Sequence, residues 1–168
     1  MEELITEVDN DDKFLCLRPR SDFYQNRKLI HRSANLLLFN VNNELLLQKR
    51  SKNSNWFPDL YDFSASGTVG DESYEKCMAR EIKEELGLKI NFNEAFKYFH
   101  ESEVGRTFKM VFIATNTGDI KANVLEVDSV RWINLLDLQN KINQYSEKFT
   151  PQFIEGIKRY IKFKGDKK

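Results

Sequence analysis

Hydrophobic and polar residues follow two different periods along this chain, and the periods predict strands and helices in different places. Short apolar or alternating runs are typical of strands. Such runs lie at residues 3–8, 14–17, 34–39, 45–50, 89–99, 107–115 and 127–133. The turn cluster Asn10-Asp11-Asp12 separates the first two runs, so we expect an N-terminal hairpin.

Apolar residues with helical spacing occur in three further stretches, at residues 73–86, 135–142 and 151–163. Ser21 or Asp22 is expected to cap a shorter helical turn that runs through Gln25. Residues 165–168 are expected to fray. Strands before and after a central helix, together with a C-terminal helix, predict an α/β layered sandwich.

The helix expected at 73–86 has clear boundaries and two different faces. A loop that contains Gly67 and Gly70 precedes it, and Gly87 follows its last apolar residue as a C-cap signal. The residues expected to face the core are Met78, Ala79, Ile82 and Leu86. The other side carries three glutamates with helical spacing, which are Glu81, Glu84 and Glu85.

These three glutamates allow two interpretations. In the first they form a solvated acidic face, and neighbouring lysines and Arg80 relieve part of the repulsion. In the second they hold a hard divalent cation, because Mg²⁺ and Mn²⁺ prefer oxygen ligands and cancel the repulsion between carboxylates.

The stretch around this helix resembles the Nudix box, Gly-x5-Glu-x7-Arg-Glu-U-x-Glu-Glu-x-Gly-U, in which U is aliphatic. Glu72 matches the first glutamate, and residues 80–88 match the rest of the motif without a mismatch. Strict spacing places the first glycine at Ser66, whereas the glycine here is Gly67, which we interpret as a loop one residue shorter than in the family.

The resemblance implies a Nudix-type α/β/α sandwich with a mixed sheet and an N-terminal β-hairpin. It favours one domain over residues 1–168, with a hairpin extension at 1–30, a core at 31–164 and a frayed tail at 165–168. Residues 29–32, 45–51, 56–62 and 126–133 are similar to one Nudix branch, which contains isopentenyl-diphosphate isomerases and the hydrolases most similar to them.

The family resemblance implies that the protein cleaves a diphosphate linkage in a nucleoside diphosphate derivative, with Mg²⁺, or alternatively Mn²⁺, as cofactor. The implied metal ligands are Glu81, Glu84, Glu85 and the carbonyl of Gly67. The residues expected to take part in catalysis are Glu72, Arg80, Glu84 and Glu85. We expect Arg80 to pair with a carboxylate of the box. The box leaves the general base open among Glu101, Glu103 and Glu126.

Arginines and aromatic residues before the box are candidate substrate ligands. Arg50 and Arg32 are expected to contact phosphate oxygens, and Trp56 is expected to stack on a base. The alternative for the arginines is a solvated charge at a strand end, and the alternative for Trp56 is a place at the edge of the core.

Two other functions remain to be compared with hydrolysis. An isomerase of this branch needs a cysteine before the box glycine and a histidine after it, and here those positions hold Ser66 and Thr68. His31 matches one metal histidine of the isomerases. A nucleotide-binding Nudix domain without turnover would tend to lose the metal glutamates, which this chain keeps.

Composition limits the classes of molecule that this chain is expected to bind. The 168 residues suggest one domain with a substantial core, and the formal charge of zero, from 26 basic and 26 acidic residues, gives no case for binding nucleic acid in bulk. Cys16 and Cys77 have no metal-ligand spacing. We expect a small phosphorylated substrate, no membrane contact and a cytoplasmic location, and the sequence specifies no oligomeric state.

Overall fold

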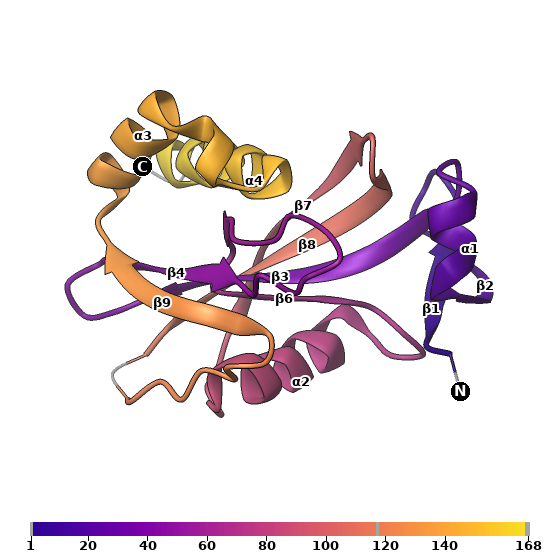
Figure 1. Ribbon diagram of the computed structural model, residues 1–168, viewed down its shortest axis with the longest axis horizontal. Coiled ribbons are helices and arrows are strands. Elements are labelled where there is room, and N and C mark those ends of the chain that lie inside the picture. Colours follow the sequence, from indigo (N-terminus) through magenta and orange to yellow (C-terminus); the bar gives the residue numbers. More distant parts are fainter. Residues whose placement is uncertain (1, 117, 167–168) are drawn as a thin grey trace.

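One mixed sheet runs through the molecule, with nine strands among the described residues, and helices cover both of its faces (Figure 1). The computed structural model describes residues 2–116 and 118–166. Helix α2 (Tyr74–Leu86) lies against one face, whereas α3 (Leu135–Gln144) and α4 (Pro151–Gly165) lie against the other. The predicted α/β sandwich with a mixed sheet is therefore confirmed.

The described strands precede α3 along the chain, and two short helices lie at separate places in the chain order. In chain order they are β1 (Leu4–Val8), β2 (Phe14–Pro19), β3 (Ile30–Phe39), β4 (Leu45–Arg50), β5 (Tyr61–Asp62), β6 (Ala65–Thr68), β7 (Asn93–Ser102), β8 (Gly105–Thr115) and β9 (Val127–Ile133). The short helices are α1 (Arg20–Gln25), between β2 and β3, and the 3-10 helix η1 (Ser146–Lys148), between α3 and α4. Strand β3 is central, because it pairs antiparallel with β1, β4 and β6 and parallel with β8.

The apolar half of β3 contributes to two separate cores. Leu36 and Leu38 pack on the side of α2, and Leu37 and Phe39 pack on the side of α3 and α4. Successive side chains of a strand point to opposite faces, so an unbroken apolar run is what a strand covered on both faces requires.

Helix α2 has the ends that the sequence predicts. The Ser73 side chain accepts a hydrogen bond from the backbone N–H of Lys76, and Gly87 ends the helix in the left-handed region with a φ of 65°. One predicted core residue is wrong, because Ala79 is exposed and Cys77 is buried in the α2 core instead.

Other boundaries also differ from the sequence expectation, and β3 and β8 begin earlier than predicted, at Ile30 and Gly105. Strand β7 begins at Asn93, and α1 begins after Pro19 without a side-chain cap from Ser21 or Asp22. Helix α4 continues through Gly165, so the expected fraying does not begin there, and residues 167 and 168 lie outside the described part of the chain. Within the described residues, no helix combines the length and apolar character needed to cross a membrane.

The predicted N-terminal hairpin is confirmed as an antiparallel pair of β1 and β2, and one buried carboxylate joins it to the rest of the fold. Asp12, which is 8% exposed, accepts a hydrogen bond from Arg32 Nε at 2.6 Å and pairs with Lys97. The Tyr74 hydroxyl lies 3.2 Å from both carboxylate oxygens of Asp12. The hairpin turn is thus bound to β3, β7 and α2 at once.

Replacing Asp12 with asparagine tests this connection. Asp12→Asn leaves the Arg32 and Lys97 charges without their carboxylate, and breaking such a buried pair costs about 3 kcal/mol of unfolding free energy. Urea denaturation measures the loss. Asp11→Asn in the same turn is the matched control, because Asp11 is exposed, and it should change the unfolding free energy by less than about 0.5 kcal/mol. Equal effects of the two changes would contradict the assignment.

Candidate functional site

A cavity of about 510 Å³ opens beside the sheet, and most of the side chains around it are polar. Its walls come from β3, β4, β6, β7 and β8, from one side of α2, and from the segments around residues 51–57 and 125–126. Carboxylates stand at one part of the wall and cationic side chains at another. The cavity therefore has the charge distribution to bind an anion together with a cation.

Three glutamates converge at the carboxylate part of the wall. Glu81 and Glu85 come from adjacent turns of α2, Glu126 comes from the residue before β9, and carboxylate oxygens of all three lie within 4.8 Å of one another. Glu81 and Glu85 are each only 7% exposed. The interpretation of these two residues as part of a solvated acidic face is therefore wrong.

Burial makes the charged state of this cluster unfavourable. Loss of water raises the pKa of Glu81 to about 7 despite the neighbouring Arg80 guanidinium. Loss of water, and then the Glu81 charge, raises the pKa of Glu85 to about 8. A divalent cation would satisfy both carboxylates at neutral pH, and a set of oxygen donors fits a hard ion such as Mg²⁺.

Strand β6 shapes the floor under the cluster. The backbone N–H of Ser66 donates to Glu85 Oε2 at 2.9 Å. Gly67 leaves space for Glu81, because a Cβ atom at this position would lie 2.0 Å from Glu81 Oε1. This contact explains why the glycine stands at residue 67 in this chain, one position later than strict box spacing would place it.

Arg80 connects three carboxylates of the box, as the sequence predicts. Its guanidinium donates to Glu72 Oε1 at 2.8 Å, to Glu81 Oε1 at 2.6 Å and to Glu84 Oε2 at 3.0 Å. The Glu84 side chain is 49% exposed and lies outside the carboxylate cluster. The structure thus brings together two of the three predicted metal glutamates and adds Glu126.

The sequence had placed Glu126 among the candidate general bases and not among the metal ligands. The signal was its position directly before the strand 127–133, where the resemblance to the family places a glutamate. Its proximity to α2 follows from the loop that precedes β9, in which Asn123 N–H donates to the Glu85 carbonyl at 2.9 Å. Spacing along the chain carries no information about that contact.

Two of the three predicted substrate ligands line the cavity. Arg50 donates from Nε to the Trp56 carbonyl at 3.1 Å and lies 3.5 Å from Asp62 Oδ2 through Nη1. The Trp56 ring contacts Tyr24 at a centroid separation of 5.7 Å, and the Arg27 guanidinium lies 5.2 Å from its centroid.

Arg32 is not at the cavity, and the expectation that it contacts phosphate is corrected. Its neighbours His31 and Ser33 line the cavity, so alternation along β3 points Arg32 to the other face. There it pairs with Asp12 and lies over the Tyr74 ring at 5.3 Å.

Sequence reasoning missed one cation at the cavity. Lys109 of β8 is 8% exposed, and its Nζ lies 3.2 Å from Ser33 Oγ. Loss of water lowers the pKa of Lys109 to about 8. The sequence contained one signal for Lys109. This lysine lies two residues before Val111, so it shares a face of the strand with an apolar residue that is buried.

Comparison with known proteins gives consistent matches. The NUDIX domain profile matches residues 29–153. A prenyl-diphosphate phosphatase of Methanosarcina mazei is 39% identical over 163 residues, which cover 95% of each chain. Isopentenyl-diphosphate Delta-isomerase 1 of Photorhabdus laumondii is 27% identical over 161 residues, which cover 91% of each chain.

The fold has a similar solved structure. The crystal structure of DR0079 from Deinococcus radiodurans superposes with a TM-score of 0.82 at 22% sequence identity, over 94% of this chain and 98% of that chain. This likeness concerns the fold.

Gly67→Ala tests the packing of Glu81 under β6. The added methyl group must displace the Glu81 carboxylate, so we expect Mg²⁺ affinity to fall at least about 10-fold. The stabilisation of the protein by added Mg²⁺ in thermal unfolding measures the effect. Gly118→Ala is the control, since its nearest new contact is an ordinary 3.5 Å to Asn116 Oδ1. Unchanged Mg²⁺ affinity in Gly67→Ala would refute the packing argument.

The burial of Lys109 predicts a pH dependence of stability. Its folded pKa of about 8 lies below the ordinary 10.5, so between these values the unfolded chain binds more protons and unfolding free energy rises with pH. Below about pH 8 both states are protonated and the cost of burial is fully present. Asp62 and Glu155 oppose this shift of the Lys109 pKa, and Arg50 adds to it.

Urea denaturation of the wild type and Lys109→Met from pH 7 to about 10.5 measures this dependence. The wild type should gain stability relative to Lys109→Met as the pH rises through the window. A constant difference between the two proteins would show that Lys109 keeps its ordinary pKa.

Proposed function

This chain belongs to the Nudix family, and on that premise we propose that it is a Mg²⁺-dependent hydrolase that breaks the phosphoanhydride bond of an organic diphosphate. The observation that carries the proposal is the buried cluster of Glu81, Glu85 and Glu126 at the wall of a cavity that also contains Arg50 and Lys109. A divalent cation would neutralise the glutamates, and an anionic substrate would neutralise Arg50 and Lys109 in the same cavity.

We assign the metal to Glu81 and Glu85, the two buried glutamates of the cluster, with the Gly67 carbonyl as a further candidate ligand, and we assign the exposed Glu126 to proton transfer. When bound, Mg²⁺ or Mn²⁺ would neutralise charge on phosphate oxygens and acidify water. Arg80 holds the Glu81 carboxylate in place and is held in turn by Glu72. Glu84 would join the cluster only if its ion pair with Arg80 opened.

The reaction requires one water molecule and one proton acceptor. The water oxygen forms a bond to phosphorus, the bridging P–O bond breaks, and the leaving phosphate departs with the electron pair. The water proton passes to a carboxylate at the cavity wall. Glu126 is suited to accept it, because it is exposed and its carboxylate receives one hydrogen bond, from Asn123 at 3.0 Å.

We propose a prenyl diphosphate as substrate. The similarity to the Methanosarcina mazei prenyl-diphosphate phosphatase supports this class. So do Val124 and Leu125, which are 80% and 81% exposed beside Glu126, with Leu125 at the cavity wall. An isoprenoid chain would cover such apolar side chains.

A nucleoside diphosphate derivative, which the sequence had suggested, is the second candidate. The observation in its favour is the aromatic group of Trp56, Phe57 and Tyr24 at the cavity, which could stack on a base. Trp56 already contacts Tyr24 and Arg27, which reduces the ring surface left for a base.

The isomerase alternative has less support in this cavity. Ser66 lies at the position of the isomerase cysteine, and neither Cys16 nor Cys77 is among the cavity residues. A serine hydroxyl is a weak acid for protonating a carbon atom. The similarity to the Photorhabdus isomerase is therefore attributed to common ancestry of the fold.

Metal removal and a substrate panel test the proposed function. Hydrolysis of the phosphoanhydride bond in prenyl diphosphates, nucleotide sugars, dinucleotides and nucleoside triphosphates, followed by chromatography of the products, should stop in EDTA and return with Mg²⁺. We expect the highest kcat/KM with a prenyl diphosphate. Full activity in chelator would refute the metal assignment. Formation of an allylic isomer from isopentenyl diphosphate, with incorporation of deuterium from heavy water, would show an isomerase instead.

Glu85→Gln tests the cluster itself. The change keeps the shape of the side chain and removes one charge, so kcat should fall roughly 10³-fold, equivalent to about 4 kcal/mol of transition-state stabilisation. The metal-free protein should be as stable as the wild type or slightly more so, because like charges no longer repel each other. Steady-state kinetics and urea denaturation measure the two effects. Glu147→Gln, at an exposed glutamate of η1, is the control and should leave both unchanged.

A further inference from the structure

Lys109 is a buried cation without a carboxylate partner. Its side chain projects from β8 toward the cavity, the residue is 8% exposed, and its Nζ contacts Ser33 Oγ at 3.2 Å. Among the residues that the structure describes, none places a carboxylate at ion-pair distance from it. An ammonium group has three donors, so Lys109 keeps two for a ligand.

The carboxylates that influence Lys109 are engaged with other partners. Asp62 accepts hydrogen bonds from Thr150 Oγ1 at 2.9 Å and Gln152 Nε2 at 3.3 Å, and Arg50 pairs with it. Glu155 lies 2.5 Å from His100 Nδ1 and also pairs with Arg159. Because neither forms an ion pair with Lys109, its buried charge is only partly compensated by their more distant charges, and such burial is costly in a protein interior.

The sheet register places this lysine within reach of a ligand at the metal cluster. Ser33 of β3 is the register partner of both Lys109 on β8 and Thr68 on β6. Two strand spacings separate β8 from β6, a distance of about 10 Å. Lys109, Glu81 and Glu85 line the same cavity, so a diphosphate beside the glutamates could extend one phosphate toward Nζ.

A second buried polar atom faces the same region. His100 lines the cavity, its Nδ1 is taken by Glu155, and its Nε2 is buried with no hydrogen-bond partner among the described residues. His100 is the register partner of Thr107, two residues before Lys109 on β8. Two buried nitrogens without full hydrogen bonding therefore converge on this part of the wall.

We propose that Lys109, with the Ser33 hydroxyl, forms an anion subsite that binds the phosphate group which a metal ion at the carboxylate cluster would not hold. The identity of the ligand as a diphosphate rests on the proposed function, whereas the subsite rests on the buried cation. A monophosphate could bind either a metal ion at the cluster or the subsite, whereas a diphosphate could bridge the two. The subsite therefore selects diphosphates over monophosphates.

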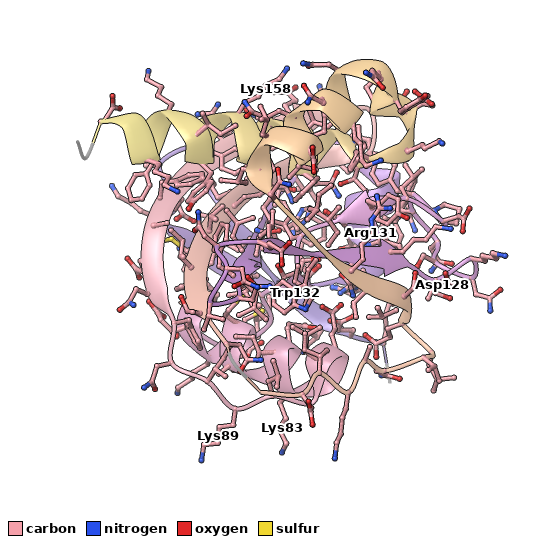
Figure 2. The ribbon with its side chains drawn as sticks, turned by 90° about the vertical axis from the view of Figure 1, so that its left-hand side faces the viewer. Lys83, Lys89, Asp128, Arg131, Trp132 and Lys158 are labelled. Atoms are coloured by element: carbon pink, nitrogen blue, oxygen red, sulfur yellow. The ribbon has the colours of Figure 1, made fainter. Side chains whose placement is uncertain are left out.

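Calorimetric titration of the full chain with inorganic diphosphate tests the subsite without turnover of an organic substrate. Lys109→Gln should weaken binding at least about 10-fold, and Ser33→Ala should weaken it about threefold. Lys89→Gln, at an exposed lysine that points away from the sheet, is the matched control and should bind like the wild type (Figure 2). Thermal unfolding of metal-free Lys109→Gln should occur at or above the wild-type temperature, because the buried charge is gone.

Equal affinity of Lys109→Gln and the wild type for inorganic diphosphate, or no binding by the wild type, would overturn the subsite. If Lys109→Gln does not fold, Ser33→Ala decides the question by the same titration. Hydrolysis assays separate the two proposals: a KM at least about 10-fold higher in Lys109→Gln supports the subsite. Binding that depends on Lys109 without hydrolysis of any tested diphosphate would refute the proposed function and leave the subsite standing.

Discussion

The burial of Glu81 and Glu85 on adjacent turns of one helix is the constraint on which the site depends. Two carboxylates in a dry environment raise each other's free energy, so the surrounding structure must hold them in place. Ser66 supplies a backbone donor, Gly67 supplies space, and Arg80 supplies charge. The contacts of Ser66 and Gly67 join β6 to α2, so the geometry of the site and the packing of the helix on the sheet depend on each other.

Zero net charge conceals a polarised cavity. Acidic side chains gather where α2 meets β6 and the start of β9, and Lys109 and Arg50 lie on the strands across the floor. Lys109 does not meet the glutamates directly, because β3 lies between β6 and β8, and Arg50 pairs with Asp62. A ligand could neutralise both groups if one of its anionic ends bound Lys109 and the other bound a metal ion held by the glutamates.

The residue pattern of β3 explains where the cavity ends. The face of β3 toward α4 carries His31, Ser33 and Asn35 in its first half and then changes to Leu37 and Phe39. The first half lines the cavity, and the second half packs under α3 and α4. The opposite face holds the hairpin through Arg32 and its contact with Asp12. A single strand thus separates the cavity, the core and the hairpin connection.

The sequence by itself determined the elements and the local motif. Turn, cap and periodic signals act over a few residues, so the α2 boundaries, the hairpin and the glutamates Glu81 and Glu85 could be predicted. Only the tertiary structure decided which distant side chains meet them. Glu84 turns to Arg80 and Glu126 takes its place, because ion pairing and the path of the loop before β9 depend on contacts that spacing does not encode. Lys109 faces the cavity and Arg32 does not, because the pairing register and the helices that cover each face assign side chains to the two sides of the sheet.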